Sequence, residues 1–332
     1  MNEISMAQAL NAALRDAVKD DDRVLIFGED VGPLGGVFRV TDGITADFGE
    51  ERCFDTPLAE AGIVGFAVGM AMGGFRPVVE MQFDAFAYPA FEQITSHVAK
   101  LRNRTRGALS LPMVIRIPYA GGIGGVEHHC DSSEAYYTHT PGLRVVTPGT
   151  PQDAYDLLRD AIDSPDPVIF LEPKCRYWAK EAVSFTRGKA PMDRAVVRRA
   201  GKDVTLLAYG PMVATALETA EAATAEGWDV EVVDLRSLNP FDDETVSASV
   251  RRTGRAVVVH EAAGFGGYGA EVVARVTEQC FHRLHAPVLR VTGLDIPYPP
   301  PKLERHQLPD VDRILDTIAR LQWHDEPVVA GA

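Results

Sequence analysis

Glu60 is the strongest candidate for chemistry, because it stands alone at the start of a run of small and apolar residues. No residue from Ala61 to Phe75 is charged, and Gly62, Gly65 and Gly69 recur at helical spacing. This spacing predicts a buried helix that another backbone can approach closely. Since burial penalises the charged form of a carboxyl group, Glu60 is expected to exchange protons near neutral pH. The alternative is that Glu60 only interacts favourably with the helix N-terminus.

A second candidate site is a glycine motif late in the chain. Gly264-Phe-Gly-Gly-Tyr-Gly269 matches the dinucleotide-binding fingerprint and lies between an expected strand and an expected helix. A working fingerprint would make the chain an NAD-dependent oxidoreductase. Against this, residues His260 to Ala263 lengthen the turn, and no acidic residue ends a following strand at the usual distance of about 20 residues. Nicotinamide binding is therefore an alternative of a different class.

The loop Gly121–Gly125 leads into His128, His129 and Cys130. Adjacent histidines on an extended chain point to opposite faces, so these two are not expected to share a metal ion. A cysteine beside a histidine is a poor nucleophile–base pair, and Cys130 is expected to be a packing residue. The glycine loop is expected to be mobile and to border a site, where one histidine binds an anionic substrate or moves a proton.

Alternating strands and helices must position these residues. This alternation is typical of α/β folds with parallel sheets. The expected strands are residues 24–27, 77–81, 113–117, 168–171, 204–208, 230–235, 255–259 and 288–291. Ser5 with Gln8 resembles a capping box before the first helix, and Thr150-Pro151 begins another helix. The proline-containing segment 181–202 is expected to link two domains, residues 1–180 and 203–332.

Composition narrows the class of protein further. The chain has 332 residues, 46% of them hydrophobic, and a formal net charge of -14, which disfavours nucleic-acid binding and suits a basic protein partner. There is no evident signal peptide, and the uncharged run is shorter than the roughly 20 residues of a membrane span. The four cysteines form no Cys-x-x-Cys pair, which argues against zinc and disulfides. A cytoplasmic protein without a membrane partner is expected.

Several motifs occur together in an order that is characteristic of one family. They are Gly28-Glu-Asp-Val-Gly32, Gly35-Gly-Val-Phe38, Phe54-Asp-Thr-Pro-Leu-Ala-Glu60, Gln82-Phe83, Gln93-Ile94, His139-Thr-Pro-Gly-Leu143 and Asp234-Leu-Arg-Ser-Leu-Asn-Pro240. Over nearly its whole length the chain resembles the beta subunit of the thiamine-diphosphate-dependent dehydrogenase of 2-oxo acid dehydrogenase complexes. The runs 63–66, 91–94 and 129–137 look most like the branched-chain (2-oxoisovalerate) type, and the pyruvate type is the close alternative.

This resemblance implies a fold and a set of site residues. The fold would be a transketolase-like pyrimidine-binding domain followed by a transketolase C-terminal domain, both with mainly parallel sheets. Glu60 would bond a ring nitrogen of the aminopyrimidine and promote deprotonation of the thiazolium carbon. His129 would approach the 2-oxo acid and aid acyl transfer to lipoamide. The other residues implied to bind the cofactor are Leu58, Phe86, Gln82 and Glu29, of which Glu29 is about as well explained as a solvated turn carboxylate.

The resemblance also implies that other polypeptides take part. Relatives hold magnesium and the diphosphate with a Gly-Asp-Gly segment, which this sequence lacks. An alpha subunit would therefore supply those groups in an alpha2beta2 heterotetramer. Branched-chain relatives also hold a monovalent cation, potassium, with backbone carbonyls, and the matching residues here are Leu111, Met113, Val114, Ala161, Ser164 and Asp166.

The activity implied is oxidative decarboxylation of a branched-chain 2-oxo acid, followed by acyl transfer to lipoyl-lysine of the dihydrolipoyl acyltransferase core. The C-terminal domain would contact its twin and dock the basic subunit-binding domain of that core. The same chemistry on pyruvate or an acetoin-derived substrate is the alternative, and a purely structural partner subunit is a third reading.

Overall fold

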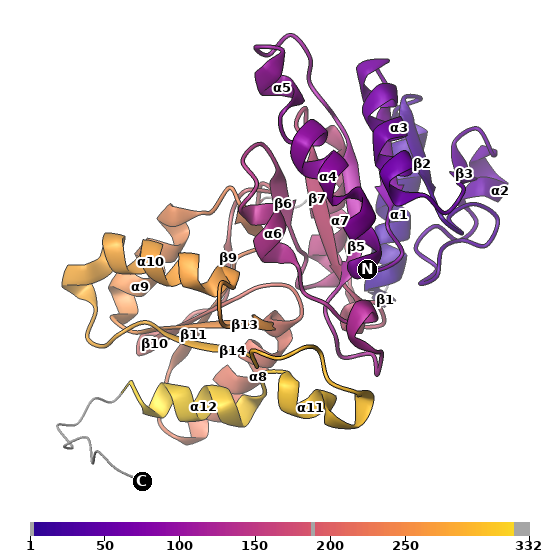
Figure 1. The fold of residues 1–332 in the computed structure, drawn as a ribbon. Coiled ribbons are helices and arrows are strands. Elements are labelled where there is room, and N and C mark those ends of the chain that lie inside the picture. The colour runs from indigo at the N-terminus through magenta and orange to yellow at the C-terminus, as the bar shows by residue number, and fades with distance from the viewer. Residues whose placement is uncertain (1–2, 187–189, 322–332) are drawn as a thin grey trace.

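Two mainly parallel sheets, each with helices on both faces, make up most of the chain (Figure 1). The structure is a computed structural model that describes residues 3–186 and 190–321. The first sheet has the order β12-β6-β7-β5-β4-β2-β3, and only β12 runs antiparallel. Its strands are β2 (Val24–Gly28), β3 (Cys53–Asp55), β4 (Arg76–Glu80), β5 (Val114–Tyr119), β6 (Arg144–Val146), β7 (Val168–Pro173) and β12 (Ser237–Asn239).

Alternate residues of the first sheet enter two separate apolar layers, because a strand presents successive side chains to opposite faces. On β2, Leu25 and Phe27 pack toward α3 (Glu60–Met72), whereas Val24 and Ile26 pack toward α1 (Met6–Asp20) and α7 (Pro151–Asp163). Burial on both faces explains why these strands read as continuous hydrophobic runs. Ser5 and Gln8 form the expected capping box of α1, and Thr150 caps α7.

Shorter helices complete the first half of the chain. They are α2 (Ile44–Phe48), η1 (Ala85–Ala90), α4 (Phe91–Gln93), η2 (Ile94–Val98), α5 (Leu101–Arg104), η3 (Glu127–His129), α6 (Glu134–Thr138) and η4 (Lys174–Arg176). A separate pair of strands, β1 (Glu3–Ser5) and β8 (Lys180–Ala182), is antiparallel. In the described ranges 3–186 and 190–321, no helix combines the length and apolar character that a membrane crossing requires.

The second sheet has the order β14-β13-β10-β11-β9, in which β9 alone is antiparallel. Its strands are β9 (Val196–Arg199), β10 (Val204–Ala208), β11 (Val230–Asp234), β13 (Ala256–Ala263) and β14 (Leu289–Gly293). In Figure 1, α9 (Asp243–Thr253) and α10 (Tyr268–Cys280) cover its upper face, and α8 (Met212–Ala225) and α12 (Val311–Ala319) cover its lower face. The remaining helices are η5 (Phe281–Arg283), η6 (Pro301–Leu303) and α11 (Glu304–Gln307).

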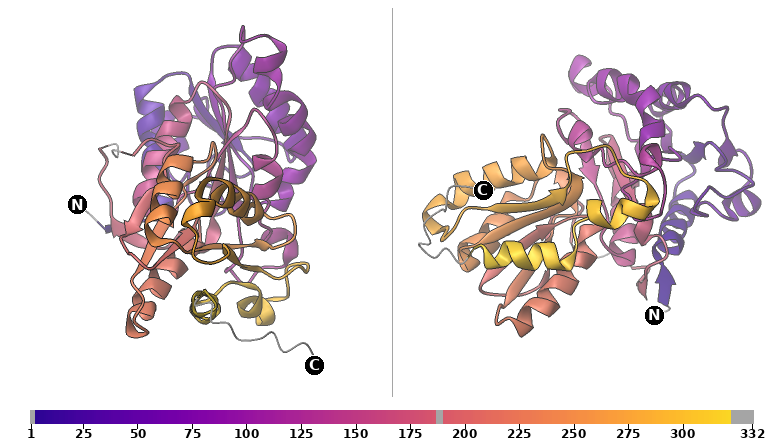
Figure 2. Two further views of the ribbon diagram at one scale, coloured as in Figure 1. Left: turned by 90° about the vertical axis from the view of Figure 1, so that its left-hand side faces the viewer. Right: turned by 60° about the horizontal axis from the view of Figure 1, so that its bottom comes forward.

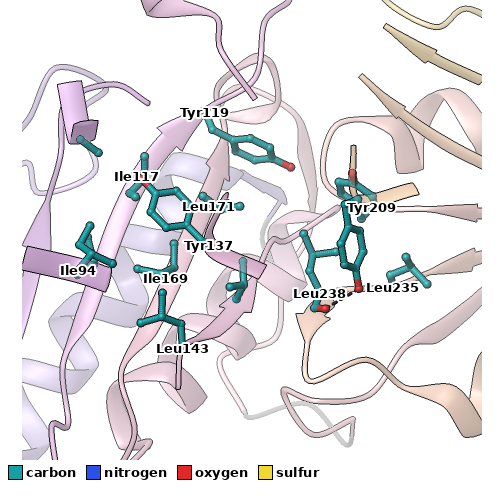
Figure 3. Packing of buried hydrophobic residues seen from close by; sticks show 14 of the residues in the cluster. Ile94, Ile117, Tyr119, Tyr137, Leu143, Ile169, Leu171, Tyr209, Leu235 and Leu238 are labelled. Atoms are coloured by element: carbon teal, nitrogen blue, oxygen red, sulfur yellow. Dashed lines mark hydrogen bonds between the residues drawn. The ribbon is translucent and has the colours of Figure 1, made fainter. Parts of the chain in front are cut away.

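One apolar core joins the two halves. Figure 3 shows Ile117, Tyr137 and Leu171 of the first half in the same cluster as Tyr209 and Leu235 of the second. The buried hydroxyl of Tyr209 donates a hydrogen bond of 2.7 Å to Glu134 Oε1, and β12 of the second half pairs with β6 of the first. The two sheets are therefore held together by packing and by hydrogen bonds.

The sequence predicted the long strands but missed the short ones. Each of the eight expected runs overlaps an observed strand, whereas β1, β3, β6, β8, β9 and β12 were not expected. Two of these, β8 and β9, lie within or across the edge of segment 181–202, part of which is outside the described residues. The domain limits at 180 and 203 stay a prediction.

Candidate active site

The carboxyl ends of β2 and β4 form the base of the candidate site. In parallel sheets, loops that follow the strands meet at one edge, where ligands commonly bind. Glu29 follows β2 directly, and Gln82 lies two residues beyond β4. Gln82 Nε2 donates a hydrogen bond of 2.8 Å to Asp30 Oδ2 across the two loops. A side chain at Gly28 would place its Cβ 2.5 Å from the carbonyl oxygen of Glu80, so this approach of the strands needs glycine.

Two carboxyl groups come together at this edge. Glu60 is the first residue of α3 and is half-buried in this chain. Glu29 is only 8% exposed, and its Oε1 has no hydrogen-bond partner. Burial raises the pKa of Glu29, and the negative charges of Glu60 and Asp30 raise it further. Glu29 is therefore a buried acid within reach of the charge of Glu60, and the interpretation of Glu29 as a solvated turn carboxylate is wrong.

The helix that carries Glu60 is not buried on all sides. Ile63, Val64 and Ala67 pack on the sheet, but the other face is open: Phe66 is 53% exposed, and no atom beyond the backbone of the same helix lies within 4 Å of a Cβ built at Gly69. The expectation of a buried helix was wrong for this face, because the run is apolar all round and gives no sign of which side meets the sheet. Leu58, just before the helix, is 79% exposed.

An aromatic cluster brings His129 to the same region. The ring of His129, in η3, lies 4.5 Å from Phe83 and 5.4 Å from Phe86 between centroids. Phe86 belongs to η1, which packs against α3, so η1 connects Glu60 with His129. Burial lowers the pKa of His129, and the charge of Lys174 acts in the same direction. His129 is therefore mainly neutral near pH 7.

The two histidines are not arranged as the sequence suggested. Residues 127–129 form a turn of 3-10 helix, so the rings of His128 and His129 lie 4.5 Å apart instead of on opposite faces. Cys130 is buried, and burial raises the pKa of its thiol to about 11, which agrees with a packing role. Among residues 3–186 and 190–321, no cluster of His, Cys, Asp or Glu side chains is arranged to hold a metal ion.

A buried charged group beneath the cluster was missed from the sequence. Lys174 follows β7 directly, and its Nζ is buried, lies 6.0 Å from the centroid of Phe83 and has no hydrogen-bond partner. Burial lowers the pKa of Lys174 to about 8, although Asp84 and Glu261 oppose this. Burial raises the pKa of Glu261 to about 7. The signal was a lysine three residues after the predicted parallel strand 168–171.

The backbone carbonyls expected to hold a cation already accept hydrogen bonds within the chain. The bonds are Met113 N to Leu111 O, Val168 N to Met113 O, Ser164 N to Ala161 O and Ser164 Oγ to Asp166 O. Val114 lies in β5, and the side chain of Asp166 pairs with Arg102. A carbonyl oxygen has a second lone pair, so the cation site at these residues stays a prediction.

The glycine motif at 264–269 does lie between a strand and a helix, β13 and α10. Its glycines, however, meet protein atoms. A Cβ at Gly269 would lie 2.5 Å from Nε2 of His260, and one at Gly267 would lie 2.3 Å from the carbonyl oxygen of Ala263. The imidazole of His260 is fully buried and has no hydrogen-bond partner on either nitrogen. Close packing on His260 therefore explains these glycines without a nucleotide.

His260 should make folding sensitive to acid. Burial lowers its pKa to about 4, whereas an unfolded chain binds that proton near pH 6.5. Stability present above pH 6.5 is therefore lost as the pH falls toward 4, by up to about 3 kcal/mol. Urea unfolding at several pH values is expected to show a smaller acid loss for His260→Leu than for the unchanged chain. His282→Leu, at an exposed histidine, is the control, and equal pH dependence of all three proteins would contradict this account.

The fold and the site together define a transketolase-like protein. The family model described as the transketolase pyrimidine binding domain matches residues 2–178, and that of the transketolase C-terminal domain matches residues 193–314. Among solved structures, the chain is similar to a split-gene transketolase described as an inactive beta4 tetramer. That similarity has a TM-score of 0.78 with 26% identity, over 96% of this chain and 98% of the other.

Similarity to curated proteins identifies the family of this chain more specifically. The chain is 55% identical to the 3-methyl-2-oxobutanoate dehydrogenase subunit beta of Mycobacterium tuberculosis (strain CDC 1551 / Oshkosh), over 96% of this chain and 92% of the relative. It is also 55% identical to the pyruvate dehydrogenase E1 component subunit beta of Leifsonia xyli subsp. xyli, over 96% and 95%. Identity with the 2-oxoisovalerate dehydrogenase subunit beta of Pseudomonas aeruginosa is 46%, over 90% and 89%. The chain belongs to the family of 2-oxo acid dehydrogenase beta subunits.

Proposed function

We propose that this beta subunit binds the pyrimidine end of thiamine diphosphate and takes part in oxidative decarboxylation of a branched-chain 2-oxo acid. One observation carries the proposal: Glu60, at the start of α3, lies close enough to the buried Glu29 at the sheet edge for its charge to raise the pKa of Glu29, and both residues lie inside the segment that the pyrimidine-binding model matches. The acyl group would then pass to lipoyl-lysine of an acyltransferase core.

The residues around Glu60 fit an aminopyrimidine ring. Such a ring has polar nitrogens at its edge and an apolar face. Glu29 offers a buried oxygen without a partner, and Gln82 adds a polar side chain nearby. Phe86 and Leu58 offer hydrocarbon surface, and most of Leu58 is uncovered in this chain. A ring with a polar edge and an apolar face would match these acidic and apolar side chains better than water molecules would.

Each residue of this chain then has a defined task. When bound, thiamine diphosphate supplies the nucleophilic carbon and the electron sink that decarboxylation requires. Glu60 holds or releases a proton at a ring nitrogen, and the charge of Glu60 favours the protonated form of the buried Glu29. Phe86 packs on the ring and keeps water away. His129, which is largely neutral, binds the 2-oxo acid at its carboxylate end. It also moves a proton during acyl transfer.

A partner subunit is proposed to complete the site. The sequence has no Gly-Asp-Gly segment to hold magnesium and the diphosphate, so an alpha subunit is assigned that role. Leu58, Phe66 and Met72 are exposed apolar side chains on and before α3. Leu58 lies two residues before Glu60, so an alpha subunit that covers these side chains would also exclude water from the carboxyl group.

The shared site predicts that this chain alone is inactive. Turnover is expected only after reconstitution with an alpha subunit, magnesium and thiamine diphosphate, because the isolated chain lacks the group that anchors the diphosphate. The measurement is 2-oxo acid decarboxylation by the chain alone, the alpha subunit alone and the pair. Full decarboxylation by this chain without a partner would refute the shared-site proposal.

The preferred substrate is tested with the same reconstituted pair. Relatives named for branched-chain substrates and for pyruvate both reach 55% identity, so the comparison of rates decides. We expect kcat/KM to be higher for 2-oxoisovalerate and 4-methyl-2-oxopentanoate than for pyruvate. A clear preference for pyruvate would favour the second candidate, a pyruvate dehydrogenase beta subunit, and would leave the thiamine chemistry unchanged.

The second half of the chain is proposed to dock the acyltransferase core. The net charge of -14 suits a basic subunit-binding domain. Affinity for that domain is expected to fall roughly tenfold or more between about 50 and 500 mM salt, because ions screen exposed charges. Titration calorimetry at several salt concentrations measures this, and a flat salt dependence would contradict the electrostatic part. The proposal also includes magnesium held by the alpha subunit and potassium held by the backbone carbonyls described above. It further includes a cytoplasmic location.

A further inference from the structure

The histidine loop is closed at its base by one backbone contact. The amide of Ala120 donates a hydrogen bond of 2.8 Å to the carbonyl oxygen of Asp131, so residues 120–131 leave and re-enter the fold at the same point. Ala120, Gly122 and Gly124 have positive φ angles of 70°, 79° and 68°. These angles turn several amide N–H groups of the loop toward one side, where they need acceptors.

The acceptors come from the second half of the chain. Glu304, at the start of α11, accepts hydrogen bonds from Gly122 N at 2.9 Å and from Gly124 N at 3.2 Å. Tyr298 donates to the same carboxylate at 2.7 Å and lies 3.2 Å from Gly122 N, and Glu261 accepts from Gly121 N at 2.6 Å. Figures 1 and 2 show α11 beside the first half of the chain.

Packing leaves the loop little room at this contact. A Cβ at Gly121 would lie 1.9 Å from the hydroxyl oxygen of Tyr298, and one at Gly122 would lie 3.0 Å from Cβ of Cys175. On its other side, a Cβ at Gly125 would lie 2.8 Å from Sγ of Cys130. The loop was expected to be mobile, but in the structure both halves of the chain contact it.

We propose that Tyr298 and Glu304 are positioning residues that hold the histidine loop, so that His129 stays against Phe83 and Phe86. This role rests on the function proposed for His129. Backbone N–H groups bind a carboxylate more strongly than they bind a neutral acceptor. Without Glu304 the loop amides would turn to water, and a displacement of about 1 Å in a reacting group is enough to cost a large factor in rate. The C-terminal half thus contributes to the active site as well as to assembly.

Hydrogen exchange of the full chain, alone and in the reconstituted complex, tests the contact itself. The peptide that covers residues 119–128 is expected to exchange roughly ten- to hundredfold faster in Glu304→Ala, because hydrogen bonds to a charged acceptor are lost. Tyr298→Phe is expected to give a smaller increase, and Glu304→Gln, which keeps one acceptor oxygen, should recover part of the protection. Glu278→Ala, at an exposed carboxylate of α10, is the control. Unchanged exchange in Glu304→Ala would overturn the proposal.

A double-variant cycle tests positioning separately from stability. In the reconstituted enzyme Glu304→Ala is expected to lower kcat roughly 10- to 100-fold, with Glu304→Gln in between. In a His129→Ala background the same change is expected to alter kcat less than about twofold, because the group being positioned is gone. Faster exchange with unchanged kcat, or an undiminished loss in that background, would overturn the positioning role. Full activity of His129→Ala would refute the task of His129 and this role with it, whereas the exchange data would still report the contact.

Discussion

Glu60→Gln in the reconstituted enzyme is expected to lower kcat roughly 10²- to 10⁴-fold, the range typical for loss of one general acid or base. Glutamine keeps the size and hydrogen-bonding reach of the side chain but cannot gain or lose a proton. Glu60 lies at the start of α3, and its charge adds to the effect of burial in raising the pKa of Glu29. Steady-state decarboxylation of a 2-oxo acid measures the effect.

Two further measurements distinguish a catalytic role of Glu60 from a general effect of replacing a glutamate. Glu50→Gln, at an exposed carboxylate that precedes β3, is the matched control and should retain nearly full activity. Coenzyme binding by Glu60→Gln should weaken far less than kcat falls, because the amide still contacts the ring. If turnover of Glu60→Gln stayed nearly intact, the chain would be a structural partner subunit instead of a catalytic one.

His129→Ala is expected to lower overall turnover roughly 10²-fold or more. Burial lowers the pKa of His129, so the neutral imidazole persists to lower pH than that of an ordinary histidine. The acidic limb of the kcat/KM profile should therefore lie below pH 6.5 and should disappear in the variant. A pH series of the overall reaction and of acyl transfer to a lipoyl domain measures both effects.

His97→Ala tests whether the replacement of any histidine lowers turnover or changes the pH profile. His97 is an exposed residue of η2, and its replacement should leave the pH profile unchanged. A His129→Ala enzyme with the unchanged profile and rate would mean that His129 only packs against Phe83 and Phe86.

The parallel architecture could be predicted because its strands are buried on both faces. A run such as Val168–Leu171 is apolar at every position, and this pattern survives without knowledge of the neighbours. The strands that were missed have only three or four residues. For β12, pairing with β6 depends on a partner about 90 positions away in the chain, and no local pattern encodes such a pairing.

Part of the candidate site could also be predicted from the sequence. Glu60 and Glu29 stand next to predicted secondary structure and within family motifs, so they could be proposed as site residues from the sequence. Glu261 and Glu304 were missed because their contacts with the glycine loop join residues 140 to 182 positions apart. The open face of α3 was missed because Gly62, Gly65 and Gly69 are compatible both with burial in this chain and with contact to another.

The most direct test is a structure of the reconstituted complex with thiamine diphosphate bound. We expect a carboxyl oxygen of Glu60 within about 2.6–3.2 Å of a pyrimidine ring nitrogen, with the diphosphate and magnesium held by the other polypeptide. Glu60 pointing into bulk water, or a coenzyme enclosed entirely by one copy of this chain, would contradict this expectation.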